Sequence, residues 1–423
     1  MAGRALAFLR RKYFRYKARS SRSQTKNTLS EEAGLTISDK EIDIYKSAVK
    51  IIIAGDLILL KDAVSNAYDG SEYNFTSTFE YTKKYISDAD LAIGVFEGPC
   101  AGEDTGYSSS NRDDGIPLAL NFPDSFAKAV KVAGFGLVST ANNHVLDKGV
   151  DGALRTLDVL DAIGLTHIGS YRSQADKEQI KIIEIKGVRF AFLAYTYGSN
   201  KIKIEKLRKS ENSYISSFLA DPSSAQFRSA KADVLNDFER AKKEKPDVIV
   251  VLPHMGSEFI RKPDYYQKAW NKVFIEAGAD IVLTDHSHHV QPIEFRGDAL
   301  IVNGVGNFCC SYTKNNGDAS SLLEIYIDQN NKKVRGVSII PLYTQAPLGR
   351  TYRALPIYDI LTDPDLREQI SVYEYERIKE VHELITSVML GCKLPIDMAM
   401  SRYYKTKDGF FQDVLSPPPI IEQ

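Results

Sequence analysis

Side chains suited to metal binding and hydrolysis occur at five places in the sequence, each at or directly after the end of an apolar run. They are Asp56, Glu97, Asn143 with His144, His254, and His286 with His288. His289 follows directly, so that five of the seven histidines fall at these places. Because the carboxyl ends of strands in an open α/β sheet meet in one crevice, we expect these groups to converge there.

The types of side chain narrow the choice of metal and reaction. Carboxylate, amide oxygen and imidazole together favour Mn²⁺, Fe, Zn²⁺ or Co²⁺, whereas a structural zinc site more often uses cysteine. His286 and His288 are separated by one residue, so both can lie on one side of an extended segment and serve two neighbouring metals, with a carboxylate such as Glu97 between them. Two metals about 3.5–4 Å apart activate water and clamp a tetrahedral phosphoryl centre.

Short apolar runs position these residues and are typical of buried strands. The first, residues 49–54, stops at Gly55-Asp56, as a fully buried strand does where it enters a loop. The later runs are residues 89–96, 135–140, 248–252, 280–283 and 300–305. Two hairpins are predicted, one from residues 180–185 and 188–196, the other from residues 322–327 and 334–342.

Helical patterns alternate with the strands. They cover residues 123–132, 149–163, 224–243 and 264–277, with caps and glycine stops in support. The whole predicts a mixed α/β layered domain over residues 46–349. Residues 350–423 are rich in tyrosine and only weakly periodic, and we interpret them as a helical C-terminal extension.

Residues 1–45 read as a basic arm followed by a polar linker. Residues 1–30 hold nine Lys or Arg and no acid, so the remaining 393 residues of this chain of net charge −1 sum to −10. Residues 1–26 mix these cations with aromatic and aliphatic side chains, and such a segment can lie on an anionic membrane, each cation adding about 1 kcal/mol. A solvated tail is the alternative, and the acidic body argues against nucleic acid.

The composition excludes several classes of protein. With 423 residues, 26% charged and 43% hydrophobic, the chain is neither disordered throughout nor a multi-span membrane protein. Its four cysteines form no C-x-x-C pair. No apolar run reaches the ~20 residues of a membrane span, and the arginine-studded start is no signal peptide. We therefore expect the protein in the cytoplasm or on the inner face of the membrane.

The order of the motifs resembles the CapA family of poly-γ-glutamate capsule synthesis, within the calcineurin-like metallophosphoesterase superfamily. The matching motifs are Gly55-Asp56, Glu97-Gly98-Pro99, Ala141-Asn142-Asn143-His144-Val145-Leu146-Asp147, Leu252-Pro253-His254-Met255-Gly256-Ser257-Glu258, His286-Ser287-His288 with Gln291-Pro292, and Gly306-Asn307-Phe308. They cover about residues 49–345. The Asn-Asn-His-x-x-Asp and His-x-Gly-x-Glu blocks are specific, whereas Gly-Asp alone is common.

This resemblance implies a four-layer α/β/β/α sandwich with a dinuclear metal site. The implied ligands are Asp56 and His288 for one ion, Asn143, His254 and His286 for the other, and Glu97 as the bridge. His144 would donate a proton to the leaving group and Asp147 would orient its imidazole. A helix N-cap is the alternative role for Asp147.

Three departures from the family pattern affect the metals. The usual Asp-x-His is Asp56-Leu57-Ile58 here, so one metal has fewer protein ligands. The residue two before Glu97 is Val95 where the family often has Asn. The usual Gly-His-His-Pro-His is Thr284-Asp285-His286-Ser287-His288, in which Asp285 either fixes an imidazole or belongs to a turn, and His289 is expected outside the ligand set.

Three further residues are candidates for substrate contact. Glu258 could position His254 or touch substrate, Asn307 could donate to an oxyanion, and Arg112 could bind an anionic group. A surface glutamate and an Asn in a left-handed turn are the plain alternatives for the first two. We expect His167 and His382 to be structural or surface residues and Trp270 to belong to the core.

The sequence thus predicts a metal-dependent, phosphoesterase-like hydrolase, and the resemblance implies a link to capsule or surface-polymer synthesis. Its substrate would be a phosphoester or an anionic polymer. One alternative is a non-catalytic accessory component of a membrane-associated polymer-assembly complex. Another is an amide or ester hydrolase that acts on a γ-glutamyl polymer with the same metals.

Overall fold

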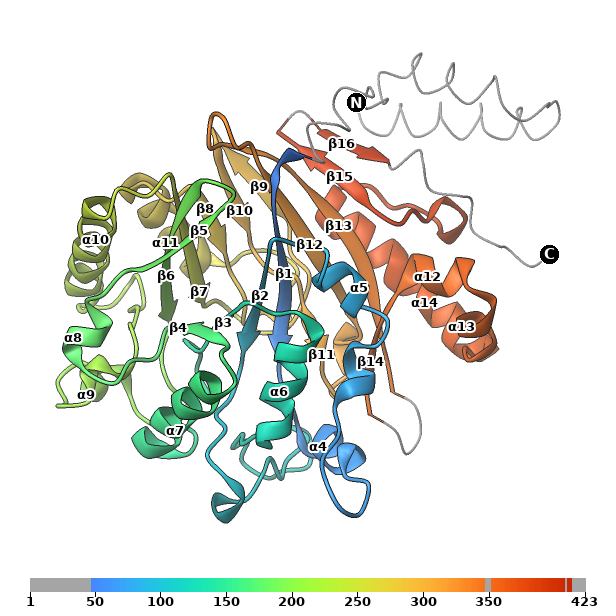
Figure 1. The fold of residues 1–423 in the computed structure, drawn as a ribbon, viewed down its shortest axis with the longest axis horizontal. Helices are drawn as coiled ribbons and strands as arrows, with labels where there is room; N and C mark the ends of the chain where they lie inside the picture. Colours follow the sequence, from blue (N-terminus) through green and yellow to red (C-terminus); the bar gives the residue numbers. More distant parts are fainter. Residues whose placement is uncertain (1–46, 347–350, 408, 413–423) are drawn as a thin grey trace.

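The computed structural model describes residues 47–346, 351–407 and 409–412. The basic arm and linker predicted for residues 1–45 lie outside this part of the chain. Two β-sheets pack face to face, and helices cover their outer faces (Figure 1). The predicted four-layer α/β/β/α sandwich is therefore confirmed.

The larger sheet holds ten of the described strands. Its order is β16–β15–β13–β12–β1–β2–β3–β4, with β11 paired to β1 and β14 paired to β13. The bounds are β1 (Val49–Leu57), β2 (Leu91–Phe96), β3 (Leu137–Ser139), β4 (Thr166–Ile168), β11 (Asn307–Cys309), β12 (Ala319–Ile327), β13 (Val334–Gln345), β14 (Arg353–Pro356), β15 (Tyr403–Thr406) and β16 (Gly409–Gln412). Strands β1 to β4 are parallel, so their carboxyl ends share one edge.

The smaller sheet has the order β5–β6–β7–β8–β10–β9. The bounds are β5 (Lys181–Ile185), β6 (Val188–Thr196), β7 (Val248–His254), β8 (Ile281–Leu283), β9 (Ile293–Arg296) and β10 (Ala299–Val302). Strands β6, β7, β8 and β10 are parallel, and β5 and β9 close the edges antiparallel. Both predicted hairpins, β5–β6 and β12–β13, are confirmed.

The four helices predicted within the α/β domain agree with α6, α7, α10 and α11 within a few residues, whereas the short helices α4, α5, α8 and α9 were not predicted. The described α-helices are α4 (Lys61–Ala67), α5 (Lys83–Ile86), α6 (Asp124–Ala133), α7 (Gly149–Ala162), α8 (Gln174–Lys177), α9 (Ile204–Leu207), α10 (Phe227–Lys243), α11 (Tyr265–Ala277), α12 (Ile357–Thr362), α13 (Pro364–Glu368) and α14 (Val372–Ile385). Helix α11 begins at a capping box between Asp264 and Gln267 and ends at Gly278 in the left-handed conformation, as such motifs do.

Alternation along the strands builds the layers. Ile51 of β1 and Phe190 of β6 point into the core between the two sheets. Ile52, the next residue of β1, packs on the opposite face with Phe126 of α6. Val251 of β7 packs in the same way on the outer core of the small sheet, which α10 and α11 cover. Because successive side chains of a strand point to opposite faces, each sheet contributes to two cores, one between the sheets and one beneath its outer helices.

The C-terminal residues differ in part from the predicted helical extension. Helices α12 to α14 are present, but β14 and β15 pair with β13, and β16 pairs with β15. Helix α14 buries Ile378 and Val381 in the core between the sheets, and Figure 1 shows these helices beside β13. The three strands have only four residues each, which is too short for alternation to show in the sequence.

Strand β1 also runs farther than predicted. Gly55 and Asp56 do not form a loop, because Asp56 pairs with Asn307 of β11 on one side and Val95 of β2 on the other. A Cβ atom on Gly55 would lie 1.7 Å from the carbonyl oxygen of Gly306. Only glycine allows this close approach of the two backbones, which brings the Asp56 carboxylate beside β11.

Candidate metal centre

All six predicted ligands meet where the strands of the two sheets end. Asp56 lies near the end of β1, and Glu97 directly follows β2. Asn143 follows β3, and His254 is the last residue of β7. The segment after β8 supplies His286 and His288. The donor groups therefore come together although the first and the last of them are more than 230 positions apart in sequence.

Glu97, His254 and His286 form the first donor set. One potential ligand atom from each of these residues lies within 4.8 Å of the other two. The Nε2 atom of His254 is 3.4 Å from Oε1 of Glu97 and 3.1 Å from Nδ1 of His286. The same Nε2 atom is 2.7 Å from Oδ1 of Asn143, so the amide oxygen completes this set.

Asp56, Glu97 and His288 form the second donor set, again within 4.8 Å of one another. The Nδ1 atom of His288 lies 3.0 Å from Oδ2 of Asp56 and 3.8 Å from Oε2 of Glu97. Glu97 belongs to both sets, with one oxygen toward each. This is the arrangement expected of a carboxylate that bridges two ions.

The donors fit a pair of divalent cations. Asp56 and Glu97 are both 0% exposed. Within the described chain, none of their four carboxylate oxygens accepts a well-aligned hydrogen bond, and Nδ1 of His254, 3.8 Å from Oδ1 of Asp56, has no hydrogen-bond partner either. Buried charges without such partners are strongly destabilising unless they are paired or coordinate a metal. The mixed oxygen and imidazole donors suit Mn²⁺, Fe, Zn²⁺ or Co²⁺.

The ionisable groups of the centre influence one another strongly. Burial, reinforced by the charge of Glu97, raises the pKa of Asp56. Burial also opposes ionisation of Glu97, but the charges of His288 and His254 outweigh it and lower the pKa of Glu97. Burial opposes protonation of His288, yet Glu97 and Asp56 raise its pKa to about 9. Burial lowers the pKa of His286 well below its ordinary value, which keeps that imidazole neutral, the form in which histidine can bind a metal.

His144 and Asp147 lie in the turn that follows β3. The Nδ1 atom of His144 is 2.6 Å from Oδ2 of Asp147, and that oxygen also accepts a hydrogen bond of 2.7 Å from the backbone N–H of Leu120. Lys148, not Asp147, is the N-cap of α7. The contact implied by the resemblance is therefore present, and the N-cap alternative for Asp147 is wrong.

Two residues of the site were missed by the sequence analysis. The Nδ2 atom of Asn200 lies 3.3 Å from Nε2 of His144, and its backbone N–H donates to the carbonyl of Asn143. The ring of Tyr197 lies 4.6 Å from that of His286. Both follow the end of β6, so the strand-end rule applied to the hairpin strand could have found them.

Four residues other than glycine that lie at or near the donors have positive φ. They are Arg112 at 74°, Phe259 at 57°, His286 at 101° and His288 at 54°. Such conformations cost about 1–3 kcal/mol for residues other than glycine. Two of the four are His286 and His288 themselves, each of which places a ring nitrogen within 4.8 Å of a Glu97 oxygen.

The remaining candidates divide into residues at the centre and residues elsewhere. Asn307 contacts Nδ1 of His288 through its side-chain oxygen at 2.9 Å, and Arg112 pairs with Glu258. Asp285 is buried with no partner for its carboxylate oxygens in the described chain. Nε2 of His289 contacts the carbonyl of Asn315.

As predicted, Trp270 is a core residue, and His167 and His382 lie outside the site.

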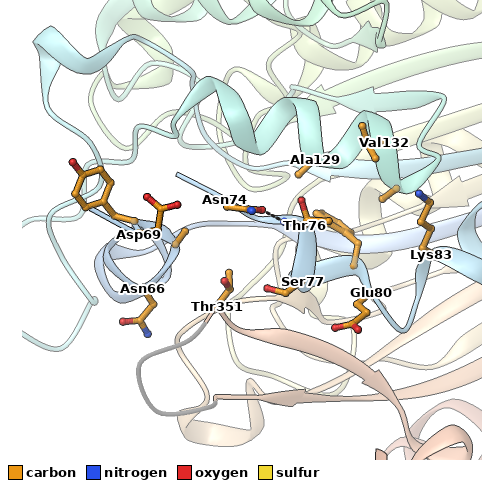
Figure 2. A pocket seen from close by; sticks show the side chains of 14 residues that line it. Asn66, Asp69, Asn74, Thr76, Ser77, Glu80, Lys83, Ala129, Val132 and Thr351 are labelled. Carbon is orange, nitrogen blue, oxygen red and sulfur yellow. Dashed lines mark hydrogen bonds between the residues drawn. The ribbon is translucent and has the colours of Figure 1, made fainter. Parts of the chain in front are cut away.

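A separate cleft lies on the outer face of the large sheet. It has a volume of about 740 Å³ and is lined by residues of α4, η1 (Thr76–Phe79) and α6 (Figure 2). Figure 2 shows Asn74, Ser77, Glu80 and Thr351 on its wall. None of its described lining residues belongs to the donor sets, so this cleft is not the metal centre.

Comparison with known proteins gives the family. The model of the bacterial capsule synthesis proteins (PGA_cap) matches residues 50–312, which include every residue of both donor sets. The chain belongs to this family. The implied membership is therefore confirmed, and the matched segment covers the predicted domain up to β11.

Two relatives are named for capsule or PGA biosynthesis. The chain is 27% identical over 301 residues to the capsule biosynthesis protein CapA of Bacillus anthracis, covering 69% of this chain and 67% of that protein. It is 25% identical over 272 residues to the PGA biosynthesis protein CapA of Bacillus subtilis (strain 168), covering 64% and 66%. The chain thus spans about two thirds of the length of these relatives.

Solved structures with similar chains include a calcineurin-like phosphoesterase. YfkN of Bacillus subtilis overlaps 72% of this chain and 87% of its own, with 13% identity and a TM-score of 0.37. A protein of Thermus thermophilus overlaps 68% and 97%, with 11% identity and the same TM-score. These overlaps are loose, and the architecture rests on the strand pairing described above.

Among the residues that the structure describes, no helix is both long and apolar enough to cross a bilayer.

Proposed function

We propose that the protein is a metal-dependent phosphoester hydrolase that acts in the synthesis of a capsule or another anionic surface polymer. One observation carries the catalytic part. Two donor sets share the buried Glu97, and their carboxylates have no well-aligned hydrogen-bond donors in the described chain. The link to capsule synthesis is supported by the family and by the names of the two Bacillus relatives.

The proposed site divides binding from proton transfer. Glu97 would bridge two divalent ions, with Asp56 and His288 on one ion and Asn143, His254 and His286 on the other. When bound, such ions supply Lewis-acid charge that polarises a phosphoryl group and activates water. The chain's own acid would be His144, which lies beside the donors and is held by Asp147. Its Nε2 atom would donate a proton to the leaving oxygen.

The decisive experiment uses one ligand histidine and one distant histidine. Purified protein is loaded with Mn²⁺, and its metal content and hydrolysis of p-nitrophenyl phosphate and bis-p-nitrophenyl phosphate are measured. We expect His254→Ala to lose metal and turnover while the circular dichroism spectrum is unchanged. His167→Ala, at a histidine paired with Asp161 near the surface, should keep both. Unchanged turnover in His254→Ala would reject the proposal.

An accessory role is the second candidate. A Mycobacterium tuberculosis protein that is 24% identical over 188 residues is named a probable polyglutamine synthesis accessory protein. An accessory component would need the fold but not the reaction. Cells that carry Asp56→Asn or His144→Ala would then make normal amounts of polymer, whereas a catalytic role requires that polymer is lost.

We also propose that residues 1–26 bind the inner face of an anionic membrane. The support is the density of cations among aromatic side chains in this arm. Deletion of residues 1–25 should reduce sedimentation with vesicles that contain anionic lipid. Equal sedimentation of the full chain and the deletion would reject membrane binding.

A further inference from the structure

Arg112 is held on an aromatic platform beside the metal centre. Its guanidinium carbon lies 4.6 Å from the ring centre of Phe259 and 5.9 Å from that of Tyr312. Phe259 in turn lies 5.5 Å from the ring of His288. A planar cation stacked on aromatic rings keeps its N–H edge free to bind an anion. The platform therefore brings one fixed positive charge to the edge of the donor sets.

Glu258 supplies the anion that Arg112 binds in this structure. Its Oε2 atom is in direct contact with Nη2 of Arg112. A potential ligand atom of Glu258 also lies within 4.8 Å of those of His286 and His288. The carboxylate thus lies between Arg112 and the two ligand imidazoles, where an anionic group of a substrate would bridge the same groups.

The pair is poorly explained as a stabilising contact. The side chains of Arg112 and Glu258 are 28% and 27% exposed, and partly exposed ion pairs contribute little to folding. Both Arg112 and Phe259 have positive φ, which is unfavourable for side chains of this size. A loop that accepts this strain in exchange for a weak contact is typical of a binding site.

The loop that carries Arg112 is firmly held. Asn111, its neighbour, donates to the carboxylate of Asp62 at 2.7 Å, and Ser110 donates to Asp114 at 2.8 Å. Lys314 pairs with Asp113 from the far side. These contacts fix the backbone on both sides of Arg112, so Arg112 can keep its place on the platform while the side chain of Glu258 moves away.

We propose that Arg112 binds an anionic oxygen group of the substrate and that Glu258 occupies the guanidinium until the substrate displaces it. This inference rests on the proposed function, because it assigns the residue that selects the substrate of the same site. The guanidinium fork matches the spacing of phosphate oxygens as well as that of a carboxylate. Glu258 is therefore a built-in competitor of the substrate.

The test measures binding of inorganic phosphate by calorimetry to protein loaded with Mn²⁺, with metal content determined for each variant. Arg112→Gln should weaken phosphate binding about tenfold, the effect of losing one charge-assisted hydrogen-bonded pair. Glu258→Gln should strengthen it by a few fold, because the competitor loses its charge. Arg172→Gln, at a surface arginine paired with Asp158 and Asp161, should change nothing.

The opposite signs separate this role from a purely structural one. If the pair only stabilises the loop, both single variants weaken phosphate binding or neither does, and either result overturns the proposal. Loss of metal in Glu258→Gln would make Glu258 a ligand and also overturn it, as would absence of phosphate binding to the wild type. In p-nitrophenyl phosphate hydrolysis, Arg112→Gln should raise KM more than it lowers kcat.

Failure of the proposed function would look different. Wild-type protein that binds Mn²⁺ and phosphate but hydrolyses neither p-nitrophenyl ester would reject the hydrolase and leave the role of Arg112 intact. Normal hydrolysis with equal phosphate affinity in Arg112→Gln, Glu258→Gln and wild type would reject only the role of Arg112.

Discussion

Asp147 holds His144 by a single short contact, 2.6 Å between Oδ2 and Nδ1. The same oxygen accepts a hydrogen bond from the backbone N–H of Leu120, so the backbone holds the carboxylate in the position from which it contacts the imidazole. A carboxylate partner at Nδ1 favours the tautomer with the proton there. The Nε2 atom is the ring nitrogen nearer to Nδ2 of Asn200, at 3.3 Å.

Removal of this carboxylate should lower the reaction rate without loss of metal. Asp147→Asn can still accept from Leu120, but it no longer stabilises a positively charged His144. We expect kcat with p-nitrophenyl phosphate to fall about 10- to 100-fold, as for other residues that orient a functional imidazole. Asp151→Asn, at an exposed acid in the first turn of α7, is the control. Equal rates in both variants would contradict the role of Asp147.

Metal removal should expose the strain of the buried carboxylates. Without a metal ion, burial and the charge of Glu97 raise the pKa of Asp56, even though His288 lies 3.0 Å away. In the presence of EDTA, Asp56→Asn should therefore be more stable than wild type by about 1–2 kcal/mol. Excess Mn²⁺ at about 100 times Kd should stabilise wild type by about 2.7 kcal/mol and the variant much less.

Thermal unfolding of both proteins, in EDTA and in Mn²⁺, tests whether the order of their stabilities reverses when the metal is added. Glu80→Gln, at an exposed acid on the separate cleft, should follow wild type under both conditions. A variant that is less stable than wild type in EDTA would show that these carboxylates are not strained.

The strand-end rule predicted the site because burial and topology act together. Runs such as residues 248–252 are apolar enough to be read as buried strands, and parallel strands must deliver the next polar residue to a shared edge. This gave His254, His286 and His288 the correct place. The extension of β1 through Gly55 was not visible, because it depends on the close approach of Gly306, which is 251 residues away in sequence.

Other features depend on tertiary contacts that leave no local pattern. Asn200 lies at the site because β6 pairs with β7, so the loop after β6 crosses beside His144. Arg112 and Glu258 were each candidates for substrate contact, but their pairing joins two loops that lie 146 residues apart in sequence, and no local pattern shows it. Four-residue strands such as β15 take their conformation from the long neighbour β13, which overrides weak local preference.

The buried His382 should make folding sensitive to acid. It is 0% exposed and its Nε2 atom lies 2.7 Å from the hydroxyl of Tyr403. Burial lowers its pKa from 6.5 to about 4. Below pH 6.5 the imidazole is therefore protonated in the unfolded chain but stays neutral in the folded chain. This contribution to stability is complete above pH 6.5 and is lost as the pH falls toward 4.

The size of this contribution of His382 follows from its pKa in the unfolded and in the folded chain. Between pH 7.5 and pH 5 the free energy of unfolding should fall by about 2 kcal/mol through this group alone. His382→Gln should remove that part of the decrease, measured as the difference between the two proteins in urea unfolding at both pH values. Identical pH dependence in variant and wild type would contradict a histidine that stays neutral in the fold.

The C-terminal segment should be inseparable from the sheet. Glu324 of β12 is 0% exposed, and Arg402 binds it through both oxygens, at 2.7 Å and 3.0 Å. Burial favours the neutral form of Glu324, but Arg402 outweighs burial and lowers the pKa of Glu324. Arg402→Gln leaves a buried carboxylate without its main cation, which costs about 3–5 kcal/mol.

A surface pair in the same region provides the comparison. Lys84 is 62% exposed and pairs with Asp359 at 2.9 Å, so Lys84→Gln should change the free energy of unfolding by less than about 1 kcal/mol. Urea unfolding of both variants measures the two losses. Because Arg402 directly precedes β15 and Glu324 lies in the centre of the large sheet, a large loss for Arg402→Gln alone means that residues after 350 fold with the metal centre as one unit. Equal, small losses would instead mean that the segment docks on a sheet that is already stable without it.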